Sequence, residues 1–446
     1  MLNPGIFSLL LLLALTVPAV AQQPIQLSLK QAVEAALEPN GNTRVQLADE
    51  MVRQAEAQSA QVRAQLLPDV SASVGKQSQT RSLSALGLKS DELPQGAQLP
   101  SVVGPYSTFD ARGTVTQKVF DFSAIRRFQA ARTGKDAAEE ENSNIRDEAA
   151  AEVARLYLAG VRAQAVLNTA HANVELSQAL LALANSQKQA GTGTGIEVTR
   201  AEVQLSNDRQ HLLVAQAEFT KARLELLKGV GLEMRTPVEF TDPLTYTPAT
   251  TRSFDEALKL AEEALPSLRA QKKREQSASL SHSAVSLERL PSVVAFADYG
   301  TTGLSASETQ PTRTFGLSVR IPIFDGGARE ARRAESASLL REEKIRSKDL
   351  ERDVELKIRI ALDAMDSADA QVQAADEGLT LAGNELEQAQ RRYTAGVASS
   401  VEVTDAQTRL QRSRENRIAA LYNHALARID LAAATGTIQQ LVNNWR

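Results

Sequence analysis

Residue types that commonly perform chemistry are sparse in this sequence. Cysteine is absent, and the four histidines do not show the close spacing of metal ligands: His171, His211, His282 and His424. The glycine-rich run at 191–195 (GTGTG) follows a predicted helix rather than a strand, and it lacks the Lys-Ser/Thr pair of a phosphate-binding loop. The sequence therefore predicts no catalytic site, no metal site and no cofactor, and we do not expect an enzyme.

Acidic residues beside two glycine-led turns are stronger candidates for function. The stretch Gly191 to Leu205 recurs 205 residues later as Gly396 to Leu410. Glu197 and Glu402 each follow a threonine or serine by three residues, which is the capping-box spacing. In a capping box the glutamate accepts a hydrogen bond from the backbone amide at the helix start. Asp405 lies one turn further into the helix, where no cap is needed, so it is the better candidate for a functional acid.

Long helices must position these turns. The segments 123–188 and 328–393 contain no proline, and at 1.5 Å per residue each would form about 100 Å of helix. Small and apolar residues recur in steps of three and four through both segments. Each segment leads through a glycine tip (189–196 or 394–400) into a returning helix, which predicts two antiparallel coiled-coil hairpins. The inward-facing positions of the first hairpin include Val153, Leu167, Val174, Ser177, Leu205, Asp208 and Leu212.

Four segments change to a period of two, which predicts strands with one apolar and one polar face. They are 69–76, 110–120, 292–300 and 314–323. Six of the eleven phenylalanines lie in or beside them: Phe109, Phe120, Phe122, Phe296, Phe315 and Phe324. Such strands suit a membrane barrel, whose interfacial aromatic residues they would supply. The alternative is a small soluble sheet packed on a core, but no other segment offers a partner layer for it.

The repeat divides the chain into five parts. We expect a secretory signal peptide at 1–21, a first repeat at 22–231, an irregular linker at 232–252, a second repeat at 253–436 and a tail at 437–446. Shorter helices precede the strands of each repeat, at 27–37 and 42–67 and again at 253–264 and 266–290. The polar, proline-containing segment at 81–106 is expected to be an exposed loop.

Composition and charge limit the class of protein. The net charge of −4 over 446 residues gives no basic face for nucleic acid. Beyond the signal no apolar run is long enough for a transmembrane helix, and without cysteine the mature start cannot carry a lipid anchor. We therefore expect an exported protein that is held in a membrane, if at all, by its strands.

Four strands cannot close a barrel. An unpaired sheet edge in a bilayer costs several kcal/mol for each orphaned backbone group, and known barrels begin at about eight strands. The sequence therefore predicts an obligate homo-oligomer, although this argument does not fix the number of copies. Taken alone, the helices would also suit a coiled-coil spacer.

The order of these segments resembles the TolC-like outer-membrane efflux proteins. The resemblance rests on VFDFS at 119–123, IFDGG at 323–327 and RRYTAGVASSVEVTDAQTRL at 391–410, and it covers nearly the whole mature chain. It implies a mainly α fold with a β-barrel part, in which two repeats of long coiled-coil helices plus a β-hairpin assemble as a homotrimer. The trimer would form a 12-stranded outer-membrane β-barrel continuous with a periplasmic α-helical barrel. The implied function is the exit duct of a tripartite efflux or type I secretion system, with a periplasmic adaptor, an inner-membrane pump and outer-membrane lipid as partners.

The resemblance also implies a closed periplasmic entrance at the tips. By position, Asp405 falls on an aspartate ring and Glu402 on its neighbouring acid. Tyr393 falls on a latch tyrosine, and Glu197 on its partner in the first repeat. Ala398 occupies the position of the latch arginine, so that ion pair is missing, which would loosen the closed state.

The same resemblance implies that Gly191 and Gly396 are the points where an adaptor docks. The rival hypothesis is a periplasmic coiled-coil scaffold or adaptor that binds partners without forming a pore.

Overall fold

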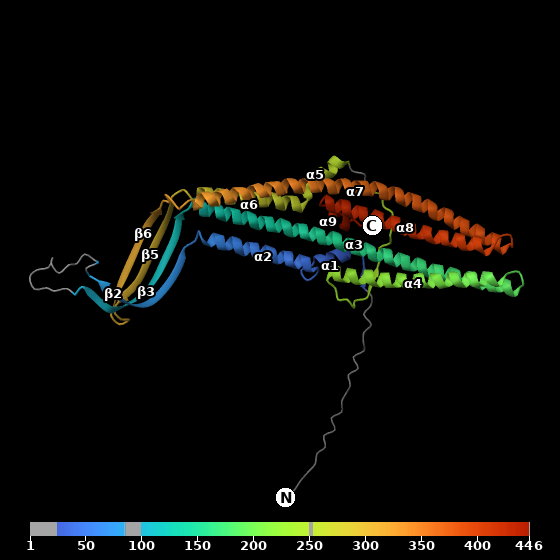
Figure 1. Ribbon diagram of the computed structural model, residues 1–446, viewed down its shortest axis with the longest axis horizontal. Coiled ribbons are helices and arrows are strands. Elements are labelled where there is room, and N and C mark those ends of the chain that lie inside the picture. The colour runs from blue at the N-terminus through green and yellow to red at the C-terminus, as the bar shows by residue number, and fades with distance from the viewer. Residues whose placement is uncertain (1–24, 84, 86–99, 249–252, 446) are drawn as a thin grey trace, which may run out of the picture.

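The molecule is a long rod of helices with a bent sheet at one end (Figure 1). The computed structural model describes residues 25–83, 85, 100–248 and 253–445. The predicted signal peptide at 1–21 lies outside these residues, as does most of the loop within 81–106. None of the helices in the described ranges is long and apolar enough to cross a membrane.

Two long helices run the length of the rod, α3 (Phe122–Gln189) and α7 (Ala328–Thr394). Each turns back at a tip into a shorter helix, α4 (Gly195–Val230) or α8 (Ser400–Ala434). The remaining helices are α1 (Leu29–Leu37), α2 (Thr43–Ala64), α5 (Phe254–Ala264), α6 (Pro266–Leu287) and α9 (Ile438–Asn443). The predicted helices are therefore confirmed to within a few residues, and α9 adds a helix where only a tail was predicted.

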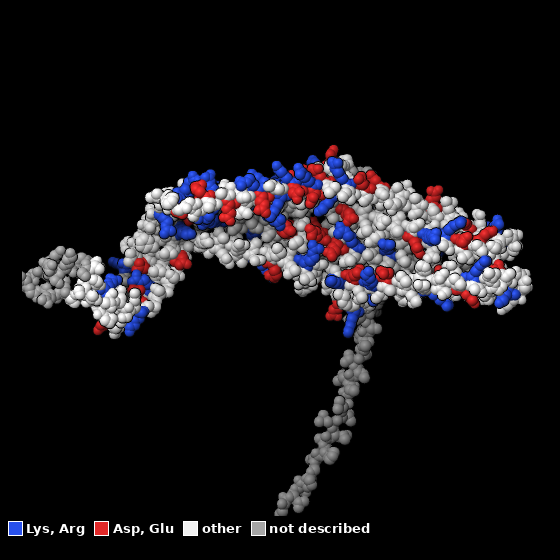
Figure 2. Space-filling model, viewed as in Figure 1, with Lys and Arg blue, Asp and Glu red and all other residues white. Residues whose placement is uncertain are grey.

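The predicted heptad seams bury the inner faces of the two hairpins. In α7 the side chains of Ile358, Met365, Val372 and Leu386 are all buried, and this helix packs along α8. Small residues alternate with them, which lets the helices approach closely. Charges of both signs are interspersed over the outer surface of the helices (Figure 2).

The sheet is antiparallel, in the order β2 (Asp69–Ser82), β3 (Val102–Phe120), β5 (Ser292–Gly303) and β6 (Thr309–Arg320). Its register aligns apolar residues on one face: Val70 lies opposite Val115, Val115 opposite Ala297, and Ala297 opposite Phe315. The predicted alternation is thus confirmed. Phe315 remains 79% exposed, so no core among the described residues covers this face, contrary to the soluble-sheet alternative.

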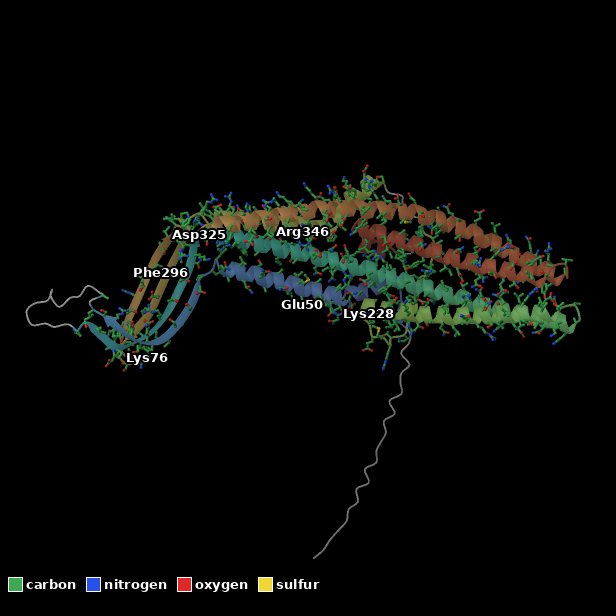
Figure 3. All side chains as sticks on the ribbon, viewed as in Figure 1. Glu50, Lys76, Lys228, Phe296, Asp325 and Arg346 are labelled. Atoms are coloured by element: carbon green, nitrogen blue, oxygen red, sulfur yellow. The ribbon has the colours of Figure 1, made fainter. Side chains whose placement is uncertain are left out.

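The other face of the sheet is polar. One row across it joins Ser71, Thr114, Asp298 and Thr314. Phe296, marked in Figure 3 on the part of the sheet near the helices, also belongs to this face. A side chain at Gly316 would collide with the ring of Phe296, because an added Cβ would lie 2.9 Å from Cζ.

The strand boundaries differ from the prediction at both ends of the sheet. β5 continues to Gly303 and β6 begins at Thr309, beyond the predicted limits of 300 and 314. β2 and β3 extend into the segment that was expected to be a loop, as far as Ser82 and back to Val102. Period-two patterning is weak there, so the backbone pairing could not be predicted from the sequence. β6 ends at Arg320 rather than at 323, because Pro322 has no backbone donor for a further ladder bond.

The linker at 232–252 is not wholly irregular, which corrects the prediction. Its β4 strand (Val238–Phe240) pairs in parallel with β1 (Ile25–Leu27). Phe240 packs against Tyr157, with ring centroids 5.4 Å apart, and it fills the space over Gly160, where an added Cβ would lie 2.2 Å from the ring. Gly160 therefore makes room for the linker.

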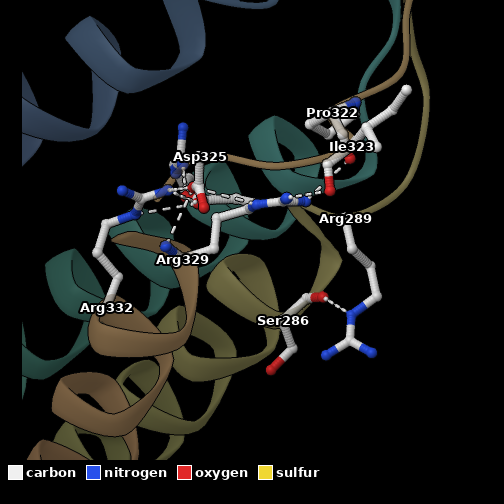
Figure 4. A network of polar contacts seen from close by, with 9 residues as sticks. Ser286, Arg289, Pro322, Ile323, Asp325, Arg329 and Arg332 are labelled. Carbon is white, nitrogen blue, oxygen red and sulfur yellow. Dashed lines mark hydrogen bonds and ion pairs between the residues drawn. The ribbon is translucent and has the colours of Figure 1, made fainter. Parts of the chain in front are cut away.

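A polar network fixes the junction between the sheet and α7 (Figure 4). Asp325 accepts hydrogen bonds from the backbone amide and the Nε of Arg329, each at 3.1 Å, and lies 3.6 Å from the guanidinium of Arg332. Arg329 also donates to the carbonyl oxygens of Pro322 and Ile323. The aspartate of the IFDGG motif thus ties the start of α7 to the chain leaving β6.

Candidate functional site

The two tips lie side by side at the end of the rod away from the sheet (Figure 1). Each reversal uses a glycine in the left-handed region, Gly191 with φ 75° and Gly396 with φ 74°. That conformation costs other L-residues about 1–2 kcal/mol. An added Cβ at either glycine would meet no atom within 4 Å. Both glycines therefore serve the turn and leave open surface beside it.

The second tip buries a tyrosine. Tyr393, in the last turn of α7, is 8% exposed and packs against Val403 and Ala406 of α8. Burial raises the pKa of Tyr393, and the charge of Glu197 on α4 raises it further. Tyr393 and Glu197 both line a cavity of about 30 Å³ between the hairpins. The fold thus brings two predicted gate residues together from opposite repeats.

The two tip glutamates behave differently. The backbone amide of Thr194 donates to Oε2 of Glu197 at 2.8 Å, as the predicted capping box requires. The second predicted capping box is wrong, because Ser399 makes no side-chain cap bond and no box forms at the start of α8. Glu402 instead pairs with Arg392, with Nε and Oε2 3.4 Å apart. Arg392, in the last turn of α7, thus draws the glutamate away from the cap.

Asp405 lies on an exposed part of α8. Across the described ranges its side chain makes no ion pair or hydrogen bond, and it does not line the cavity that holds Tyr393 and Glu197. Ala398, at the position where the resemblance implies an arginine, is half-buried in the turn. A single chain therefore leaves Asp405 without a local structural role.

A buried polar chain, which we call the hairpin tie, crosses from one hairpin to the other beside the tips. Nε2 of Gln407 (α8) donates to Oγ of Ser177 (α3) at 2.7 Å, and Ser177 donates to Asp208 (α4). Gln204 reaches both carboxyl oxygens of Asp208 at 3.2 Å. Ser177, Asp208 and Gln407 are at most 3% exposed. Buried polar groups at a helical interface can fix its register, so we infer that this tie sets how the hairpins align.

The prediction from sequence missed the hairpin tie. Ser177 and Asp208 stood at inward-facing positions of a seam that is otherwise apolar, and that mismatch was the available signal. Gln407 gave no such signal, because its partner Ser177 lies 230 positions away in the chain. Pairing between the two hairpins cannot be derived from the periodicity of either one.

Replacing Ser177 with alanine should loosen the contact between the hairpins. The change removes the donor to Asp208 and the acceptor of Gln407, and leaving buried polar partners unsatisfied costs about 1–3 kcal/mol. We expect faster hydrogen–deuterium exchange in the tip-proximal halves of α4 and α8, with unchanged exchange near the sheet. Ser186→Ala is the matched control, because Ser186 is an exposed serine of the same helix that bonds only its own helix. Equal exchange in the two variants would contradict a role for the tie.

Two of the histidines contact polar side chains. His424 is fully buried, with Nε2 3.0 Å from Oδ1 of Asp369, and burial lowers its pKa. Nδ1 of His282 lies 2.9 Å from Oγ of Ser336. Within the part of the chain that the structure describes, no three His, Asp or Glu side chains gather in a way that could hold a metal ion.

The comparison with protein families decides between a channel and a scaffold. The profile described as outer membrane efflux protein matches residues 36–232 and 257–437. These ranges hold the sheet, both helical hairpins and both tips. This chain belongs to the outer membrane efflux protein family. The predicted resemblance is confirmed, and with it the function as an outer-membrane efflux channel and the location in the outer membrane with extension into the periplasm.

Individual relatives agree with the family assignment. The pyoverdine export outer membrane protein OpmQ of Pseudomonas putida is 23% identical over 424 residues, which cover 92% of this chain and 85% of OpmQ. The outer membrane channel CmeC of Campylobacter jejuni matches in fold with a TM-score of 0.77, at 17% identity over 92% of this chain and 85% of that one. The outer membrane protein VceC of Vibrio cholerae also gives 0.77, at 18% identity over 92% and 96% of the two chains. This efflux protein therefore has the TolC-like fold.

Proposed function

We propose that three copies of this efflux protein assemble into one conduit. Three times four strands would give a 12-stranded barrel, and the helices of the three copies would continue it as an α-helical barrel through the periplasm. The sheet supports this proposal, because among the described residues its outer strands β2 and β6 each have one edge without a partner. Pairing β6 of one copy with β2 of the next removes every exposed edge.

The two faces of the sheet agree with such a barrel. The apolar face, with Phe315 79% and Leu317 72% exposed, would meet lipid. The polar face would line the lumen, where Arg112 is held by Asp110 and Asp298. In this arrangement lipid covers the apolar surface that a single chain would expose to water.

Two internal repeats would give the helical part its shape. We propose the boundaries 22–231 and 253–436, joined by the linker at 232–252. Their support is the matching order of elements, since α2, β2, β3, α3 and α4 correspond to α6, β5, β6, α7 and α8. Six hairpins from three copies would then surround the periplasmic entrance.

At that entrance we propose that Asp405, Glu402, Tyr393 and Glu197 control opening, and that Gly191 and Gly396 receive a periplasmic adaptor that links to an inner-membrane pump. The shared cavity of Tyr393 and Glu197 supports a contact that opening would break. The unpaired side chain of Asp405 supports a role that only the assembled trimer completes.

The assembly is tested by its behaviour in membranes and detergent. Mature protein is expected to fractionate with outer membranes, to run as an oligomer that heating converts to monomer, and to conduct ions in planar bilayers. The expected mass is three times that of the mature chain. A folded monomer that stays in the soluble fraction and never conducts would overturn the proposed trimeric conduit.

A further inference from the structure

The apolar face of the sheet has a sharp outward boundary on both edge strands. On β2 the residues of this face run Val70, Ala72 and Val74, and then change to Lys76, Ser78 and Thr80. On β6, followed from the helix end, they run Val319, Leu317 and Phe315, and then change to Arg313, Pro311 and Thr309. The two strands belong to different repeats, yet each changes at a basic residue.

Lys76 and Arg313 lie equally far along their strands. Each is seven residues from the helix-side end of its strand, Asp69 for β2 and Arg320 for β6. At about 3.4 Å per residue this is roughly 24 Å along the strand, or about 18 Å of barrel height at the usual strand tilt of about 40°. Figure 3 places Lys76 on the half of the sheet away from the helices, and its row across the sheet ends at Gly303 and Thr309, where β5 ends and β6 begins. Both residues therefore lie where the apolar band gives way to polar surface.

Up to the register shift that precedes Arg81 on β2, these two cations are the charged residues on the apolar face of the described sheet. In the regularly paired part of the described sheet, the other charged side chains all belong to the polar face: Asp69, Asp110, Arg112, Lys118, Asp298 and Arg320. Arg112 is satisfied there by Asp110 and Asp298. Lys76 and Arg313 are exposed, and among the described residues neither has an acidic partner. Two cations without acidic partners at the edge of an apolar face suit a ligand that has both an anionic group and an apolar part.

Aromatic side chains accompany both cations. Phe109 lies directly opposite Lys76, and Tyr299, which is 70% exposed, lies opposite Arg313. A tyrosine with an apolar ring and a polar hydroxyl suits the headgroup level of a bilayer. The lipid that meets these residues therefore has its headgroup, and not its chains, at the level of the two cations.

The edge position of β2 and β6 brings the cations together between copies. This step rests on the proposed trimer, in which β6 of one copy pairs with β2 of the next. Arg313 and the Lys76 of the adjoining copy would then lie on neighbouring strands, on the same lipid-facing surface. Each of the three seams would carry one such basic pair, so that the site is incomplete in a single chain.

We propose that Lys76 and Arg313 form a binding site at each subunit seam for the phosphate groups of a phosphorylated glycolipid in the outer leaflet. The guanidinium can hold a phosphate through two parallel hydrogen bonds, and the ammonium adds a second positive charge. The glycolipid's acyl chains cover the apolar strands below. Bridging two copies, the bound lipid also strengthens the seam.

The test is native mass spectrometry of the purified trimer titrated with a bis-phosphorylated lipid A. The variant pairs Lys76→Gln with Arg313→Gln, which keeps two polar side chains and removes two charges per seam. With about 1 kcal/mol for each basic residue beside an anionic surface, binding is expected to weaken about thirty-fold. The matched control pairs Lys118→Gln with Arg320→Gln, which removes two charges from the same sheet on its polar face, and it should bind like the unmodified protein.

Three further readings decide the outcome. Dephosphorylated lipid A should bind the unmodified trimer as weakly as intact lipid A binds the Lys76/Arg313 variant. Equal binding of lipid A to that variant and to its control, or equal binding of phosphatidylglycerol and lipid A to the unmodified trimer, would overturn the glycolipid site. Heat-sensitive oligomers and conductance, measured on the same samples, test the proposed trimer separately. If both are present but lipid binding is not selective, only the glycolipid site is contradicted. If both are absent in the unmodified protein, the trimer itself is contradicted.

Discussion

Replacing Gly396 with tryptophan should abolish efflux while the protein still reaches the outer membrane at its normal level. The glycine lies at the extreme end of the second hairpin, with open space where a side chain would project. An indole there would occupy the surface proposed for the adaptor and would hold the two proteins apart. The measurement is drug resistance or export in cells that lack their own channel, together with oligomer level and barrel insertion.

The control separates the indole from the backbone. Gly396 has φ 74°, which asparagine tolerates better than most residues because its short side chain bonds locally. Gly396→Asn should therefore keep most of the export, and Gly191→Trp should repeat the loss at the first tip. Normal resistance in Gly396→Trp cells would remove the tip from the docking surface. A lowered oligomer level would indicate a folding defect instead.

The sequence was sufficient for the elements that a local period dictates. The seam from Ile358 to Tyr393 predicted α7 because small and apolar residues recur there without proline. The alternation from Phe315 to Val319 predicted β6 for the same kind of reason. What failed was pairing that depends on distant partners, such as β4 with β1 or the strand ends that extend into the predicted loop. Backbone hydrogen bonds form there although the side chains show no pattern from which the pairing could be predicted.

The tips show the same limit at the level of single residues. Thr194 and Glu197 form the predicted cap because both members are local. Glu402 has the same spacing but binds Arg392, a residue from the preceding helix, since a cation within reach competes with a backbone amide for the carboxylate. The hairpin tie through Ser177 could not be predicted from the sequence, because it depends on how the two hairpins are placed relative to each other.

The second large effect is expected from Asp405→Ala, which should remove block of the channel by divalent cations. In the proposed trimer three copies of this aspartate surround the entrance, and a single chain gives the side chain no partner to neutralise it. At 4 Å a divalent cation gains about 2 kcal/mol from each carboxylate even in water. Loss of all three should weaken block about tenfold or more and raise the conductance for monovalent cations. Single-channel recording in planar bilayers, with and without a divalent cation, gives both values.

Three further variants test whether the effect comes from the charge at position 405. Asp405→Asn keeps the size of the side chain and should reproduce the loss of block, which would exclude a purely steric opening. Glu377→Gln removes the same charge from an exposed position on α7, 28 positions earlier in the chain, and should leave the block unchanged because a charge beyond a Debye length of about 8–10 Å is largely screened. Glu402→Gln should have a smaller effect than Asp405→Asn, since Arg392 already neutralises Glu402. If divalent block survives in Asp405→Asn, the aspartates do not form the ring, and the narrowest charged point of the conduit lies elsewhere.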